Sequence, residues 1–94
     1  MLHIISQKLN NETINRLLEM TEDQDGFVLI GDGIYGYQSL AQLKHYSALQ
    51  NNVYYLKEDA RLRGFTKKLL SHLQAISYDE LVDLTLTYDK SLTW

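Results

Sequence analysis

The most informative stretch of the chain reads Gly26-Phe27-Val28-Leu29-Ile30-Gly31-Asp32-Gly33-Ile34-Tyr35-Gly36-Tyr37. Its unbroken run of Phe, Val, Leu and Ile is typical of a strand that is buried on both faces, as in a parallel sheet covered by helices. The glycines then mark the carboxyl end of that strand. In open α/β sheets this is the edge at which ligands and partners usually bind.

The predicted elements on either side of this strand alternate between strands and helices. The apolar run quoted above predicts a strand over residues 27–30. We expect further strands at residues 2–5, 53–56, 74–76 and 91–94. We expect helices after Asn10 or Asn11, over 38–47, over 57–63 up to Gly64, and after a capping box made by Ser77 and Glu80. Short loops between such elements predict a three-layer α/β/α domain around a mostly parallel sheet of about five strands.

The two longest predicted helices each carry an apolar face. The first is expected to place Ile14, Leu17, Leu18 and Met20 on one side, and the last to present Leu81, Val82, Leu84, Thr85 and Tyr88. We expect these faces to pack on the sheet.

Length and composition fit one globular domain spanning residues 1–94. Hydrophobic residues make up 45% of the chain and charged residues 22%, which is ordinary for a soluble protein. No apolar run approaches the roughly 20 residues that span a bilayer, and the first residues lack the pattern of a signal peptide. We therefore expect a cytoplasmic protein with no membrane partner.

The sequence contains no cysteine. This excludes a disulfide, a Cys-ligated metal site and a thiol nucleophile among these residues. The formal net charge of −3 gives no general reason to expect nucleic-acid binding. Five of the nine Lys and Arg residues fall between positions 57 and 68, a pattern that favours a solvated helix face over an RNA site.

The glycines at positions 31, 33 and 36 also spell G-x-G-x-x-G, the pattern of a dinucleotide-binding turn. A predicted strand precedes them and a predicted helix follows, as that function requires. Against it, Asp32 would place a carboxylate near the pyrophosphate, and Tyr35 would add bulk where the backbone must come close. The alternative is a tight structural turn in which glycine supplies a positive φ.

Two further groups of side chains are candidates for function. His3 is expected to be a structural histidine, with a proton-carrying role beside Asp32 as the alternative. Tyr35, Tyr37 and Trp94 are candidate anchors of a partner interface, because Tyr and Trp are enriched at protein interfaces and a small domain cannot enclose every ring.

Several short motifs, in this order and spacing, resemble the TusB/DsrH family over nearly the whole chain. They are Met1-Leu2-His3, Asp32-Gly33-Ile34-Tyr35, Glu58-Asp59 with Arg63-Gly64, and a Leu84-Thr85 helix followed by Trp94. The positions that carry the resemblance are His3, Asp32, Gly33, Asp59, Arg63 and Gly64. The resemblance implies a DsrE-like fold.

The resemblance also implies a role in sulfur relay. TusB-like proteins assemble with TusC- and TusD-like subunits, two copies of each, into a heterohexamer that takes persulfide sulfur from TusA and passes it through TusE toward 2-thiouridine at the tRNA wobble position. Because this chain has no thiol, it resembles the noncatalytic TusB role, with no catalytic residue, cofactor or metal of its own and no direct tRNA contact. The alternatives are a DsrH-type subunit in dissimilatory sulfur oxidation and an independent nucleotide-binding domain.

Overall fold

Five parallel strands lie at the centre of the protein, in a computed structural model that describes residues 1–22, 24–37, 52–71 and 73–94. The strands in these residues are β1 (Leu2–Ile5), β2 (Gly26–Leu29), β3 (Val53–Leu56), β4 (Gln74–Ile76) and β5 (Ser91–Thr93). Their order across the sheet is β4-β3-β2-β1-β5, and every pairing is parallel. The prediction of a mostly parallel α/β sheet of about five strands is confirmed.

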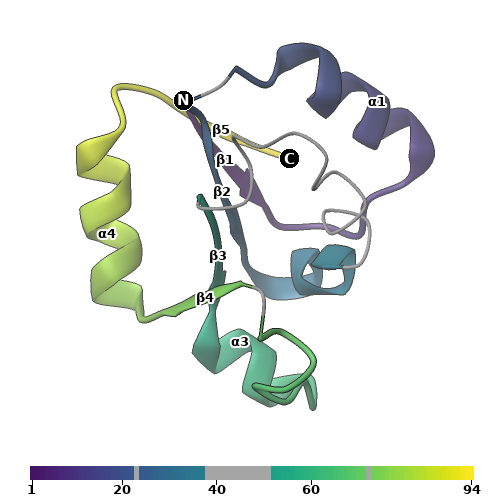
Figure 1. The fold of residues 1–94 in the computed structure, drawn as a ribbon, viewed down its shortest axis with the longest axis vertical. Coiled ribbons are helices and arrows are strands. Elements are labelled where there is room, and N and C mark those ends of the chain that lie inside the picture. The colour runs from purple at the N-terminus through teal and green to yellow at the C-terminus, as the bar shows by residue number, and fades with distance from the viewer. Residues whose placement is uncertain (23, 38–51, 72) are drawn as a thin grey trace.

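Helices cover both faces of this sheet (Figure 1). The described helices are α1 (Asn11–Met20), the 3-10 helix η1 (Gly31–Gly36), α3 (Lys57–Leu62) and α4 (Tyr78–Thr87). Successive strands from β1 to β4 are laid down in one direction, and the chain then returns across the sheet to place β5 beside β1. Because right-handed crossovers that run in opposite directions lie on opposite faces, α4 covers the face away from α1.

Two hydrophobic clusters lie on the two faces. The larger contains Ile5, Leu17, Phe27, Leu29, Ile34, Tyr55, Ala60 and Leu70, and joins α1, η1 and α3 to the sheet. The smaller contains Leu2, Val28 and Ile76, against which Leu81, Leu84 and Tyr88 pack from α4 and its end. All four residues of β2 are buried, as its continuous apolar sequence predicted.

Local capping signals are confirmed. The Asn10 side chain accepts a hydrogen bond from the Thr13 amide at 2.8 Å and begins α1. Ser77 and Glu80 form the reciprocal capping box of α4, with contacts of 3.2 and 3.1 Å. Gly64 follows α3 with φ +77°, the left-handed conformation that glycine adopts most easily.

Several details differ from the sequence-based expectations. The glycines after β2 form a 3-10 helix rather than a simple turn. Met20 and Val82, both expected on inner helix faces, are exposed. The helix predicted over 38–47 lies outside the described residues. Among the residues that the structure describes, no helix is long and apolar enough to cross a membrane.

Candidate functional site

The glycine-rich segment after β2 is held against α3 at the carboxyl edge of the sheet. Gly31, with φ +52°, donates its amide hydrogen to Oδ2 of Asp59 at 2.7 Å. Gly33 lies so close to β1 that an added Cβ would overlap the backbone carbonyl of Ile5. The first glycine therefore supplies a backbone conformation, and the second supplies the close approach of two backbone segments.

An ion pair joins the same two elements. Arg63 donates from Nε and Nη2 to Oδ1 of Asp32, both at 3.2 Å, and from Nη1 to the Asp59 carbonyl oxygen at 3.3 Å. The Tyr78 hydroxyl, at the start of α4, donates to Oδ1 of Asp59 at 3.3 Å. Asp59 thus connects η1, α3 and α4. The structure brings Asp32, Gly33, Asp59 and Arg63 together, with Gly64 directly after them, into what we call the carboxyl-edge cluster.

This cluster is a poor receptor for a dinucleotide. The Gly31 amide, which would face a pyrophosphate, is already bound to the Asp59 carboxylate. Asp32 and Asp59 add negative charge beside it, where a phosphate requires amide donors and positive potential. The glycine pattern therefore serves the packing of η1 on β1 and α3, and of the predicted positive φ values only that of Gly31 is found in this segment.

His3 belongs to a second, separate group of residues, the His3–Asp25–Trp94 cluster. The His3 side chain is fully buried in β1 and its Nε2 lies 2.8 Å from Oδ2 of Asp25. Trp94 donates from Nε1 to Nδ1 of His3 at 3.1 Å. Since Nδ1 accepts this bond, Nε2 carries the hydrogen and donates it to the carboxylate. Both ring nitrogens are engaged and shielded from solvent, and the partner is Asp25 rather than Asp32, so the proton-carrier alternative for His3 is not supported.

Asp25 is the central residue of this second cluster, and sequence reasoning treated it only as part of a polar turn. Besides His3, it accepts hydrogen bonds from the Met1 amino group at 2.9 Å and the Glu22 amide at 3.1 Å. Burial acts to raise the pKa of Asp25, but the hydrogen bonds from Met1, His3 and Glu22 outweigh it and leave that pKa below its usual value. In the sequence, the signal for its role was a carboxylate directly before the apolar strand β2. In the structure this position lies beside the start of β1.

The three aromatic candidates lie in different surroundings. Tyr35 and Tyr37 both contact the edge of the Phe65 ring, with centroid distances of 5.3 and 5.4 Å. Tyr35 is exposed and lies under the Lys8 ammonium, whereas Tyr37 is half-buried. Trp94 is half-buried beside His3. That these three residues anchor a partner interface stays a prediction.

The described residues offer no site for a metal. Nowhere in 1–22, 24–37, 52–71 and 73–94 do three or more His, Asp or Glu side chains gather so that they could hold an ion. The three carboxylates of the two clusters, Asp25, Asp32 and Asp59, are instead bound to backbone amides, to Arg63, to His3 or to the Met1 amino group.

The pKa of the Tyr78 hydroxyl depends on the carboxyl-edge cluster. The nearby Asp59 carboxylate raises the pKa of the Tyr78 hydroxyl above its ordinary 10.0, because it repels the phenolate, and desolvation and the hydrogen bond to Asp59 act in the same direction. We expect Asp59→Asn to bring this pKa back toward 10.0. NMR titration of the tyrosine rings checks it, with Tyr88 as the internal control because its pKa is raised first by burial. An unchanged Tyr78 titration would show that Asp59 does not act on it.

Comparisons with known proteins agree with this fold. A family model described as DsrH like protein matches residues 8–91. The chain is 28% identical over 95 residues to Protein TusB of Pectobacterium parmentieri and 30% identical over 96 residues to Protein TusB of Pectobacterium atrosepticum, and each alignment covers 100% of both chains. The solution NMR structure of protein Tm0979 from Thermotoga maritima is similar in fold, with a TM-score of 0.64, 24% identity, and coverage of 96% of this chain and 97% of that one.

Proposed function

The chain belongs to the family of DsrH-like proteins, and from this membership we propose that it is a noncatalytic subunit of a sulfur-relay complex. The complex serves 2-thiolation of the tRNA wobble uridine in the cytoplasm. The observation that carries the proposal is the end-to-end similarity to proteins named TusB. The partners are TusC- and TusD-like subunits, two copies of each with two of this chain, and TusA and TusE exchange sulfur with the complex.

The chemistry of the chain supports a role without catalysis. Sulfur relay passes sulfur between thiolates as persulfides, and these 94 residues contain no cysteine. His3, which could otherwise move a proton, is buried with both nitrogens bound. The reactive cysteine then belongs to the TusD-like partner, and this chain completes the assembly around it.

The two clusters support the same proposal. Each uses its polar side chains to fasten parts of this chain to one another. Asp59 and Arg63 fix the glycine segment on α3, and His3 joins β1 to Asp25 before β2 and to Trp94 after β5. Polar side chains that are bound within the chain make it rigid, as a structural subunit requires. We expect no cofactor on this chain and no direct contact with tRNA.

The proposal is tested by deleting the gene and measuring wobble 2-thiouridine in total tRNA by nucleoside mass spectrometry. We expect the modified nucleoside to fall, and a plasmid copy of the gene to restore it. Unchanged 2-thiouridine in the deletion strain contradicts the proposal and favours the DsrH-type role in sulfur oxidation.

A further inference from the structure

Helix α4 carries two apolar stripes, and the sheet covers only one of them. Its inner stripe, Leu81 and Leu84, packs against the smaller hydrophobic cluster. Its outer stripe consists of Tyr78, Val82 and Leu86, which follow one another at intervals of four residues and so lie along one side of the helix. Their exposed fractions are 55%, 57% and 79%, and α4 has no fully buried residue.

Helix α1 has no such outer stripe. On the opposite face of the sheet, α1 buries Leu17 and presents mainly polar residues to solvent, namely Asn11, Glu12, Asn15, Arg16 and Glu19. A surface helix ordinarily has this single apolar face. A second apolar stripe is typical of a helix that is covered on both sides, and none of the residues that the structure describes covers the outer stripe of α4.

The charges beside the stripe indicate what kind of surface covers it. Asp79 and Asp83 are exposed next to it, and α4 contains neither Lys nor Arg. Within the described part of the chain, neither carboxylate has an ion-pair or hydrogen-bond partner. The complementary surface on a partner is an apolar patch, here called the apolar seat, that is bordered by basic side chains. An anionic lipid surface would instead be repelled by the two carboxylates.

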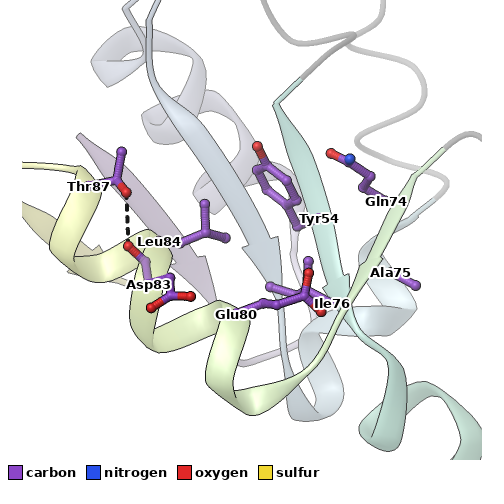
Figure 2. Close-up of a pocket in the computed structure, with 8 residues that line it drawn as sticks. All are labelled: Tyr54, Gln74, Ala75, Ile76, Glu80, Asp83, Leu84 and Thr87. Carbon is purple, nitrogen blue, oxygen red and sulfur yellow. Dashed lines mark hydrogen bonds between the residues drawn. The ribbon is translucent and has the colours of Figure 1, made fainter.

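A groove lies on the sheet side of α4, toward the edge of the sheet (Figure 2). It lies between α4 and strands β3 and β4, and its volume is about 230 Å³. Tyr54, Ile76 and Leu84 supply its apolar part, and Glu80 and Asp83 supply carboxylates. Asp83 therefore borders both the groove and the outer stripe, which makes them one continuous acidic and apolar surface.

We infer that the outer stripe of α4 is the docking surface for another subunit of the complex, one that presents an apolar seat bordered by Lys or Arg. This inference rests on the proposed function, because it names the part of the chain through which the assembly is held. Val82 and Leu86 enter the seat, and Asp79 and Asp83 face its basic border. The contact is heterologous, since Asp79 and Asp83 border the stripe and two copies of this surface would place these carboxylates against one another.

The test uses the full chain and the purified TusC–TusD-like subcomplex of the same organism, with the dissociation constant as the readout. We expect Leu86→Asp to weaken binding by at least about 30-fold, because a charge would be buried in the seat. The matched control is Leu62→Asp in α3, a leucine that is 80% exposed and is not part of the outer stripe. This control should bind as the wild type does. Both variants should keep the urea midpoint of the wild type, since exposed positions tolerate substitution.

A double variant tests the contribution of the Asp79 and Asp83 carboxylates and leaves the apolar side chains unchanged. Asp79→Asn with Asp83→Asn should weaken binding about threefold at low salt, and the difference should vanish at high salt, because exposed ion pairs are screened. Binding unaffected by these changes and by Leu86→Asp contradicts the inference while leaving the proposed function intact. Failure of the wild-type chain itself to bind contradicts the proposed function. Self-association of the chain that Leu86→Asp abolishes assigns the surface to a second copy and also overturns the inference.

Discussion

Replacing Gly33 by alanine should lower the free energy of unfolding by about 3 kcal/mol or more, with a fall in Tm of about 15 °C. An added Cβ would overlap the carbonyl oxygen of Ile5, which is backbone and cannot turn aside as a side chain can. That carbonyl also accepts the Ile30 amide at 2.9 Å, and the next residue, Ser6, donates to the Trp94 carbonyl at 3.0 Å. The substitution must therefore move η1 away from β1 or break these bonds. Urea unfolding followed by circular dichroism measures the loss.

Gly36→Ala is the matched control in the same 3-10 helix. Its Cβ would meet only the Leu9 side chain, 3.2 Å from Cδ1 and 3.4 Å from Cγ, and this side chain can rotate. We expect a change within about 1 kcal/mol. Equal losses for the two substitutions would show that the glycines matter through backbone freedom rather than through the close approach of Gly33 to Ile5.

Asp25→Asn should cost about 3 kcal/mol at neutral pH, because it removes the buried charge that accepts the hydrogen bond from His3 and pairs with the Met1 amino group. The loss depends on pH in a defined direction. The folded pKa of Asp25 lies below its ordinary 3.8, so the ionised carboxylate stabilises the fold above the unfolded pKa, and this contribution disappears as pH falls through the folded pKa. The difference between wild type and Asp25→Asn should stay constant near neutral pH and shrink in acid.

Trp94→Phe is the control for this prediction. It keeps an aromatic ring beside His3 but removes the hydrogen bond from Nε1 to Nδ1, at a cost of about 1 kcal/mol. Since Asp25 is untouched, the acid part of the pH profile should match that of the wild type. Urea titrations from neutral to acidic pH measure both variants. A wild-type profile in Asp25→Asn would mean that another carboxyl group controls acid stability.

The features that sequence could predict are those specified by neighbouring residues. The apolar run of β2, the Asn10 cap, the Ser77 and Glu80 box and the left-handed Gly64 each depend on residues a few positions apart. These local signals were sufficient for the order of strands and helices in the part of the chain that the structure describes. The parallel topology then followed from the alternation of elements.

The features that sequence could not predict depend on distant residues. His3 meets Asp25 and Trp94, which lie 22 and 91 positions away, and no local pattern marks that meeting. Gly33 is required because of Ile5, and that reason appears only once η1 lies on β1. Helical periodicity likewise identified Leu81 and Leu84 as inner residues of α4 but not where the inner stripe ends, so Val82 was placed on the wrong side.

The central claim is that this chain supports a sulfur relay without carrying sulfur. The most direct measurement follows isotopically labelled sulfur from a persulfide donor through the reconstituted complex, by intact mass spectrometry of every subunit, with and without this chain. The account predicts that the label never appears on this chain and that transfer to the acceptor falls when the chain is omitted. Labelled sulfur on this chain, or undiminished transfer without it, would contradict the account.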